Sequence, residues 1–361
     1  MNFASDNGSG AAPAILEALV AANPGTASAY GSDSFSQRAE AVLSAIFERK
    51  VASFLVSTGT AANSLALGAL TPPWSAVFCH DEAHIHDDEC GAPELFTAGA
   101  KLVGIPGEAG KITPAALRDT LARFPRGLVK SVQPGALSLS QATEAGAIYT
   151  PDEVAALSAI AHDAGLAVHM DGARFANALV ALGCSAAQLS WAAGVDALSF
   201  GATKNGAMGC EAVVFFNPEQ GANFAFQRKR GGHTLSKGRF LGAQMTAYLE
   251  GDLWLTLARR ANQAARRLAD GLAAIPAVRL AWPRQVNQVF PIAPRSLVAA
   301  LRAEGVGFYE WSSRAVPAAL APREDEAFLR LVCSFETSDS EIDRFLAIVR
   351  SHCAKATGAG R

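Results

Sequence analysis

Short apolar runs rich in β-branched residues alternate with Ala-rich segments of helical period over the first 216 residues of the chain. Such runs are typical of strands that are buried on both faces of a parallel sheet. The predicted strands are 51–57, 76–79, 101–105, 166–171, 197–201 and 212–216. The predicted helices between them are 61–70, 113–124, 151–164 and 174–182. This alternation predicts an α/β fold with a mainly parallel central sheet flanked by helices.

The helix over 151–164 has a well-marked start. Thr150 stands at the N-cap position, Pro151 occupies the first turn, and Glu153 lies three residues after the threonine. A threonine and a glutamate at this spacing form a capping box, in which each side chain accepts a hydrogen bond from the other residue's backbone.

After Leu241 the pattern changes to a single helical run over about 241–275, which Pro276 ends and which we expect to link two domains. The chain has 361 residues, more than one core usually accommodates. Predicted strands at 287–292, 307–311 and 329–334, with helices at 296–304 and 338–352, indicate a small C-terminal α+β domain. The expected division is an N-terminal arm over 1–20, a large domain over 21–250 and the small domain over 251–361.

Composition narrows the classes of partner. Half of the residues are hydrophobic and the net charge is −2, so nothing in the charge favours a nucleic acid or an anionic membrane. No apolar run reaches the roughly 18 residues of a membrane span. The six cysteines contain no C-x-x-C pair, and the first residues show neither a basic nor an apolar leader region. We therefore expect a soluble cytoplasmic protein with a small-molecule partner.

Two residues at predicted strand ends carry candidate chemistry. Asp171 closes the strand "AVHMD", and Lys204 follows the strand "ALSFG" by three residues. Open α/β sheets bind ligands at the carboxyl ends of their strands. Pyridoxal 5'-phosphate needs a lysine amine for covalent attachment and an acid that keeps its pyridine nitrogen protonated. An ordinary salt bridge between the two residues is the alternative.

The turn "STGTAAN" at 57–63 lies between a predicted strand and a helix, where the helix N-terminus attracts anions. It fits a phosphate site, although Ser, Thr and Gly before a helix are also common caps. The chain has no G-x-x-x-x-G-K-[ST] and no G-x-G-x-x-G sequence, so nucleotide binding lacks its usual support.

The stretch "CHDEAHIHDDEC" at 79–90 is dense in possible metal ligands. A metal site would use His84 and His86 with Asp87 or Glu89. This spacing matches no standard zinc pattern, and residues two apart on an extended segment face opposite ways, so we expect no metal. Glu89 is expected to orient the loop of His84 or to cap the following helix.

The ordered motifs "SDN", "YGSD", "STGTAAN", "EAH", "HMDGAR", "TKNG" and "LRLV" resemble those of the L-threonine aldolases over roughly residues 3–345. These are pyridoxal-phosphate enzymes of the aspartate-aminotransferase fold (fold type I), so the resemblance implies that fold and that cofactor, bound by the large domain. It also implies that Lys204 forms the Schiff base, that Asp171 partners the pyridine nitrogen, and that Gly59 and Thr60 bind the phosphate.

The resemblance implies further site residues. His84 would stack on the cofactor ring and is the candidate base, directly or through water. Ser5, Arg174 and Arg330 would hold the substrate carboxylate, for which a guanidinium fork is well suited. Arg174 is also expected among the cofactor-binding residues. Tyr30 matches an active-site aromatic residue, or else packs in the core. In the basic run 228–240, Arg239 best matches a phosphate-binding arginine, with Lys229 nearby.

Two segments depart from the family pattern. Many members have "ENTHN" where this chain has "LSQATEAG", so a second active-site histidine is replaced near Thr143, and the segment 231–240 is longer than usual. Both changes affect the substrate side of the site, where aldehyde preference and stereoselectivity are decided.

The resemblance implies retro-aldol cleavage of L-threonine, L-allo-threonine or a related β-hydroxy-α-amino acid such as phenylserine. The products would be glycine and an aldehyde. A β-eliminating lyase, an aminotransferase or a non-catalytic protein that binds the same cofactor remain alternatives, because one scaffold supports all of them. A homodimer or homotetramer with active sites at the subunit interface is also implied.

Overall fold

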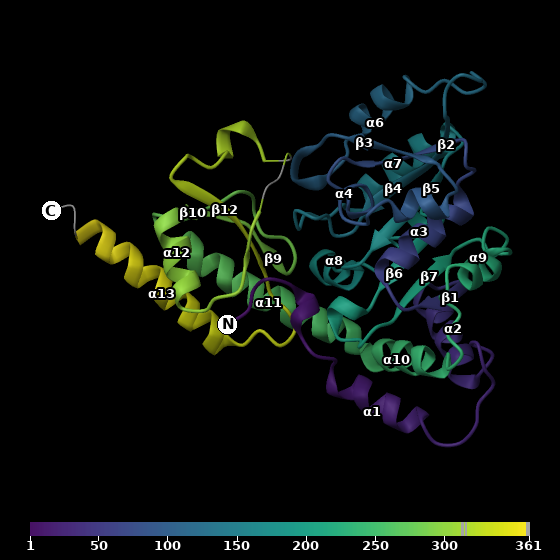
Figure 1. Ribbon diagram of the computed structural model, residues 1–361, viewed down its shortest axis with the longest axis horizontal. Coiled ribbons are helices and arrows are strands. Elements are labelled where there is room, and N and C mark those ends of the chain that lie inside the picture. The colour runs from purple at the N-terminus through teal and green to yellow at the C-terminus, as the bar shows by residue number, and fades with distance from the viewer. Residues whose placement is uncertain (312–313, 315, 359–361) are drawn as a thin grey trace.

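The computed structural model describes residues 1–311, 314 and 316–358, which form a large lobe and a smaller one (Figure 1). A seven-stranded sheet is the centre of the large lobe, in the order β1-β7-β6-β5-β4-β2-β3. Its strands are β1 (Ala52–Val56), β2 (Ser75–His80), β3 (Lys101–Ile105), β4 (Gln133–Ser140), β5 (Ala167–Gly172), β6 (Ala197–Gly201) and β7 (Glu211–Phe215). Within this sheet β7 alone runs antiparallel to its neighbours, β1 and β6. The prediction of a mainly parallel sheet is confirmed.

All six strands predicted in this region are present, but β4 was not predicted. Its sequence, "QPGALSLS", combines Pro134 and Gly135 with serines instead of a β-branched run. The sequence of β4 does not by itself indicate a strand. Its parallel pairing with β2 and β5 provides the hydrogen bonds that stabilise it as one. Tertiary context has overridden a weak local preference.

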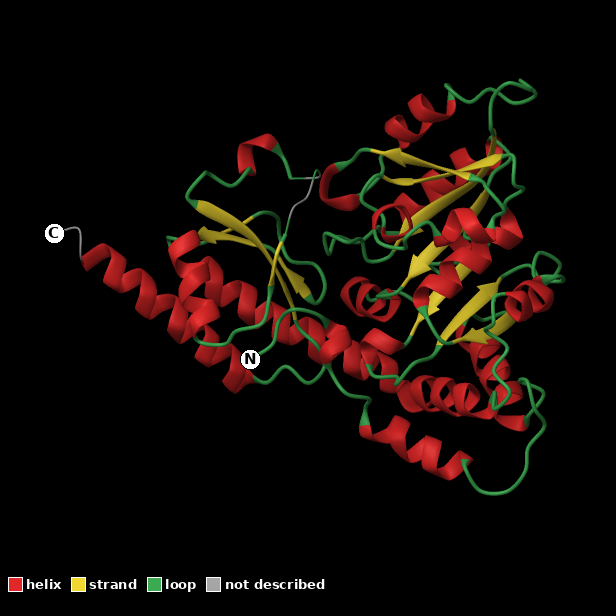
Figure 2. Ribbon diagram, viewed as in Figure 1, coloured by secondary structure: helices red, strands yellow, loops and turns green. Residues whose placement is uncertain are grey.

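Helices cover both faces of the sheet (Figure 2). On β7, Val213 and Phe215 pack with α3, whereas Ala212 and Val214 point into the larger core on the opposite face. This alternation follows from the two-residue period of a strand. The helices of the large lobe are α1 (Pro13–Ala22), α2 (Ser34–Ile46), α3 (Gly59–Leu70), α4 (His84–Asp87), α5 (Ala92–Phe96), α6 (Pro114–Leu121), α7 (Pro151–Asp163), α8 (Phe175–Leu182), α9 (Phe224–Arg230) and α10 (Arg239–Leu249).

Helix α7 begins as its sequence predicts. The Thr150 hydroxyl accepts from the backbone N–H of Glu153, and the Glu153 carboxylate accepts from the backbone N–H of Thr150. The capping box is therefore confirmed.

The prediction of one continuous helix over 241–275 was wrong. The run is divided into α10 and α11 (Leu253–Ala273), with a turn over Glu250–Asp252 between them. Gly251 and Asp252 adopt left-handed backbone angles, with φ of 63° and 56°. Glycine adopts this conformation without steric penalty and aspartate tolerates it, so the helix breaks here.

The small lobe packs helices against an antiparallel sheet. Its strands are β8 (Arg279–Leu280), β9 (Gln288–Val289), β10 (Pro291–Pro294), β11 (Tyr309–Glu310) and β12 (Glu326–Val332), and its helices are α12 (Arg295–Ala303) and α13 (Asp339–Gly358). Helix α11 joins the lobes, since Leu257 packs in the large core and Leu268 and Leu272 in the small one.

The N-terminal segment also connects the lobes. Phe3 is buried in the core of the small lobe, while α1 packs against α10 in the large lobe (Figure 1). Residues 13–20 of the expected arm thus belong to a helix. No helix in the described part of the chain is long and apolar enough to cross a bilayer.

Candidate active site

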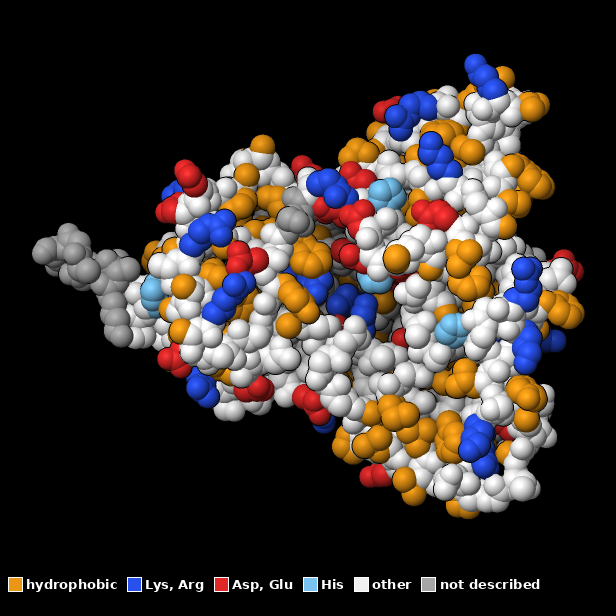
Figure 3. All heavy atoms as spheres, viewed as in Figure 1, with side chains coloured by type: hydrophobic (Ala, Val, Ile, Leu, Met, Phe, Trp, Pro, Cys, Tyr) orange, Lys and Arg blue, Asp and Glu red, His pale blue; other side chains and the backbone are white. Residues whose placement is uncertain are grey.

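Two adjoining cavities, of about 340 and 250 Å³, lie where the carboxyl ends of the parallel strands face the small lobe. They form one cleft, and Figure 3 shows the hollow between the lobes with charged side chains and a histidine exposed in it. Both cavities are lined by Asn7, Gly59, Thr60, Asn63, His84, Asp171, Ala173 and Lys204.

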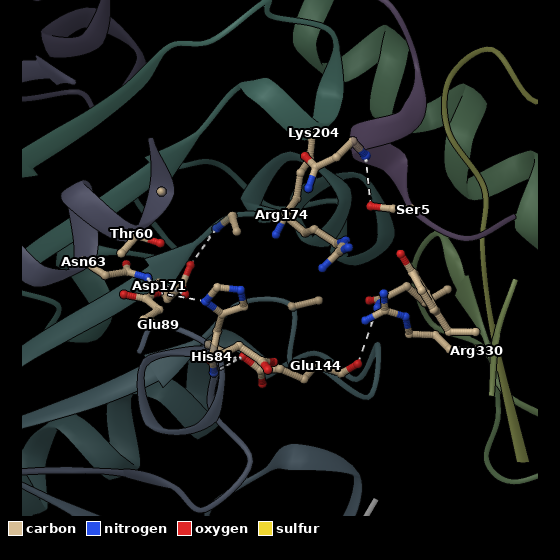
Figure 4. A pocket seen from close by; sticks show the side chains of 18 of the residues that line it. Ser5, Thr60, Asn63, His84, Glu89, Glu144, Asp171, Arg174, Lys204 and Arg330 are labelled. Carbon is tan, nitrogen blue, oxygen red and sulfur yellow. Dashed lines mark hydrogen bonds and ion pairs between the residues drawn. The ribbon is translucent and has the colours of Figure 1, made fainter. Parts of the chain in front are cut away.

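The cleft brings together eight of the ten residues to which the resemblance assigns a role in the site. Tyr30 and Arg239 are not among its lining residues in the described part of the chain. The residues brought together are Gly59 and seven that Figure 4 labels, namely Ser5, Thr60, His84, Asp171, Arg174, Lys204 and Arg330.

Asp171 ends strand β5 and is only 7% exposed. Its Oδ1 accepts from the backbone N–H of Ala173 at 3.0 Å, and its Oδ2 accepts from Asn63 Nδ2 at 2.9 Å. Burial alone would raise the pKa of Asp171, but the charges of His84 and Lys204 hold it below its usual range. The site therefore contains a fixed carboxylate.

Polar side chains of β4, β5 and β6 contact one another beside Asp171. His169 lies two residues earlier on the same face of β5, and its ring nitrogens contact Ser138 Oγ and Ser199 Oγ, each at 2.9 Å. Burial lowers the pKa of His169 to about 4, so this ring is neutral. It fills the space under the site without adding charge.

Lys204 lies in a turn of 3₁₀ helix over Thr203–Asn205 that follows β6. Burial and the charge of Arg174 lower the pKa of its amine. Among the described residues the amine has no hydrogen-bond or ion-pair partner, so it is available for covalent chemistry. A lowered pKa raises the fraction of nucleophilic neutral amine.

His84 begins the one-turn helix α4, so the expected extended conformation of this loop was wrong. Its Nδ1 hydrogen-bonds Glu89 Oε1 at 2.8 Å, and the same oxygen accepts from Asn63 Nδ2 at 2.8 Å. The bond to Glu89 raises the pKa of His84, and burial raises the pKa of Glu89, so the pair holds a proton tightly. Glu89 therefore orients the ring and leaves Nε2 facing the cleft (Figure 4).

His86 lies outside this arrangement. Its Nδ1 contacts Asp87 Oδ1 at 2.9 Å, and it is not among the residues that line the cleft. In the described part of the chain no three His, Cys, Asp or Glu side chains are grouped as a metal site.

An anion site lies at the start of α3. Thr58 caps this helix by accepting from Ala61 N–H at 3.2 Å, and the N–H groups of Gly59 and Thr60 belong to the first turn, where a helix has no internal acceptors. A Cβ added to Gly59 would meet no atom within 4 Å, so there is open space beside this backbone. The arrangement suits a phosphate group.

The two arginines of the cleft differ in their bonding. Arg174 donates from Nε and Nη2 to both carboxylate oxygens of Asp6, at 2.8 and 2.9 Å. Asp6 also accepts from Asn287 Nδ2 of the small lobe at 3.0 Å. Arg330, on β12, donates one long bond from Nη2 to Ala4 O at 3.4 Å, and its buried Nε has no partner in the part of the chain that the structure describes.

Sequence reasoning missed Asp6, Asn63 and Glu144. Glu144 Oε1 accepts from the backbone N–H of His84 at 2.8 Å and from Ser140 Oγ at 3.0 Å, which ties α4 to the loop after β4. Burial raises the pKa of Glu144. Asp6 lies inside the motif "SDN" and Asn63 inside "STGTAAN". Their position within these motifs could have indicated that both belong to the site.

Tyr30 and Arg239 lie together on a different surface of the large lobe. Arg239 Nη1 donates to the carbonyl of Gly25 at 3.1 Å, and Lys229 Nζ lies 4.9 Å from the centroid of the Tyr30 ring, which is 53% exposed. His233, on the same surface, contacts Ser57 Oγ at 3.1 Å, next to the anion site.

Comparison with known proteins identifies the family. The sequence profile of the beta-eliminating lyases matches residues 2–293. The chain belongs to this family. It is 42% identical to the low specificity L-threonine aldolase of Pseudomonas aeruginosa over 348 residues, covering 96% of each chain. It is 40% identical to the low specificity L-threonine aldolase of a Pseudomonas species over 349 residues, covering 97% of each. The threonine aldolase of Leishmania major superposes with a TM-score of 0.90 at 30% identity, covering 98% of this chain and 99% of that one.

Beta-eliminating lyases and threonine aldolases of this fold, fold type I, use pyridoxal 5'-phosphate. The residues of the cleft fit that group. The aldehyde requires an amine, and that of Lys204 has no partner among the described residues. The pyridine nitrogen requires an acceptor, which the buried carboxylate of Asp171 provides. The helix N-terminus at Gly59 and Thr60 suits the phosphate, and the imidazole of His84 suits the ring face.

Proposed function

We propose that this member of the beta-eliminating lyase family cleaves L-threonine and related β-hydroxy-α-amino acids to glycine and an aldehyde. The observation that carries the proposal is one cleft that combines a buried lysine amine, a buried carboxylate, two arginines and an oriented imidazole. The identity of 42% to a low specificity L-threonine aldolase supports the choice of reaction.

Five residues would hold the cofactor, with the His84 ring against its ring face. Lys204 supplies the amine that binds its aldehyde, Gly59 and Thr60 supply backbone N–H groups to its phosphate, and Asp171 accepts from its protonated pyridine nitrogen. When bound, the cofactor supplies an electron-poor ring that takes up the electron pair released at Cα. The low pKa of Asp171 supports this role, because the carboxylate stays ionised at neutral pH.

The substrate is oriented by its carboxylate. Arg330 has unused N–H donors and Arg174 keeps Nη1 unbonded within the described residues, so both can donate to one carboxylate, with Ser5 beside them. His84 Nε2 removes the β-hydroxyl proton, directly or through water. The hydrogen bond from Nδ1 to Glu89 makes Nε2 more basic and keeps it aimed at the cleft.

A product assay tests the proposal. Purified protein with bound cofactor is incubated with L-threonine, L-allo-threonine and phenylserine, and glycine and aldehyde are measured. Equimolar glycine and aldehyde are expected. Ammonia and a 2-oxo acid would instead indicate β-elimination, the second candidate, which the family profile favours. A protein that binds the cofactor and forms neither product pair would refute both reactions.

The proposal includes a homodimer or homotetramer with active sites near the subunit boundary. Phe226 is 71% exposed on α9, the helix whose Lys229 contacts the Tyr30 ring, and the surface of Tyr30 adjoins the anion site through His233 and Ser57. Such a contact would bring Tyr30 and Arg239 of one subunit toward the cleft of another. Sedimentation equilibrium tests this, since a fully active monomer would contradict it. Within the described residues, Cys79, Cys90, Cys184, Cys210 and Cys333 form no disulfide, which supports a cytoplasmic location.

A further inference from the structure

Arg330 is held in the cleft mainly by aromatic rings. The centre of its guanidinium lies 4.1 Å from the ring centroid of Trp311 and 5.4 Å from that of Tyr309. In the part of the chain that the structure describes, its one hydrogen bond is the 3.4 Å contact with Ala4 O. All three side chains line the larger cavity.

The small lobe fixes this arrangement through its sheet. Tyr309 on β11 lies directly opposite Arg330 on β12, and the backbone N–H of Trp311 continues the ladder by donating to Phe328 O at 2.7 Å. Tyr309 and Trp311 are two residues apart, so they share one face of the strand. Trp311 also packs against the apolar cluster that contains Phe328, which restrains its ring.

Stacking restrains the plane of a guanidinium and leaves its in-plane N–H groups unused. Arg174 differs, because Asp6 occupies two of its donors at 2.8 and 2.9 Å. Burial and the charge of Arg174 lower the pKa of Arg330 to about 10, so an anion bound between the two guanidiniums relieves their repulsion. Arg330 is therefore the principal donor available to a carboxylate.

We propose that Trp311, assisted by Tyr309, is a positioning residue that pre-organises Arg330 to receive the α-carboxylate of the amino-acid substrate. The inference rests on the proposed function in taking an α-amino acid as the ligand. Because ring and guanidinium are already in contact before the ligand arrives, little side-chain freedom is lost on binding. Removing the ring weakens recognition of the carboxylate and leaves the amine chemistry at Lys204 intact.

The test compares ligands with and without a carboxylate. Holoenzyme is titrated with glycine and with methylamine, which lacks the carboxylate, and binding is followed by the absorption of the cofactor. The variants are Trp311→Leu and, as the matched control that keeps an aromatic ring, Trp311→Phe. We expect Trp311→Leu to raise the Kd of glycine by about 5 to 30-fold, the range for a partly desolvated cation–π contact, while Trp311→Phe stays within about 3-fold.

Methylamine affinity should be unchanged in both variants, and in turnover KM should rise more than kcat falls. Equal weakening of glycine binding and methylamine binding, or no change in either, would overturn the proposal.

A second readout needs no cofactor. The fluorescence emission of Trp311, obtained by subtracting the spectrum of Trp311→Phe, should change saturably as glycine is added. A chain that gives this signal but binds no cofactor would refute the proposed function alone. Loss of the signal in a chain that still cleaves threonine would refute the inference alone.

Discussion

The contact between Asp6 and Arg174 gives a stability prediction that can be worked through from the structure. The Asp6 side chain is 2% exposed and that of Arg174 is 10% exposed, and two charge-assisted bonds of 2.8 and 2.9 Å join them. The substitution Asp6→Asn keeps the shape of the side chain and removes its charge. It leaves a largely buried guanidinium without its counter-ion.

Breaking one partner of a buried ion pair typically destabilises by about 3–5 kcal/mol, because the remaining charge is uncompensated. We expect a loss of about 3 kcal/mol, since Asn can still accept one of the two bonds from Arg174 and the bond from Asn287. The measurement is the free energy of unfolding from urea denaturation at pH 7, followed by circular dichroism. The matched control is Glu17→Gln, an exposed carboxylate on α1, which should change stability by less than about 0.5 kcal/mol.

The pH dependence provides a second check. Burial would raise the pKa of Asp6, but the charges of Arg174 and Lys204, with the hydrogen bonds from Arg174 and Asn287, together hold the pKa below its usual value. The stabilisation is therefore present above the unfolded-state pKa of about 3.9 and is lost as pH falls through the lower folded-state pKa. The difference between Asp6→Asn and the parent protein should narrow over that window. A loss at pH 7 no larger than that of Glu17→Gln would refute this account of the pair.

Three further predictions concern the chemistry of the cleft. Borohydride treatment should fix the cofactor on Lys204, and Lys204→Ala should abolish turnover with the fold intact; a peptide map with the label on another lysine would overturn the assignment. His84→Asn should keep most of the bound cofactor while lowering kcat by about 10² to 10⁴, the usual contribution of a general base, and His86→Asn should have little effect, so similar losses in both would contradict the assigned base. Glu89→Gln removes the carboxylate charge and so weakens the hydrogen bond that raises the pKa of His84, and the acid limb of the kcat/KM profile should therefore move to lower pH; an unmoved limb would show that another group titrates.

Several features were predictable because the interactions behind them are local. The capping box of Thr150 and Glu153 requires only residues three positions apart, and the buried strands are marked by short apolar runs. Asp171 and Lys204 could be paired from sequence because the carboxyl ends of parallel strands share one edge of a sheet. The ordered motifs carried the family and its cofactor for the same reason, since each motif is a contiguous turn or strand end.

Other features depend on which distant segments pack together. The bonds of Asp171 to Asn63, of His84 to Glu144 and of Arg174 to Asp6 join residues 108, 60 and 168 positions apart. Strand β4 exists because β2 and β5 lie on either side of it in the sheet. A sequence specifies such contacts only through the whole packed chain, because the free energy that selects them comes from burial and from partners that meet only after folding. The sequence by itself therefore determined the candidate chemistry and its scaffold, and the tertiary structure decided how each charged group is held.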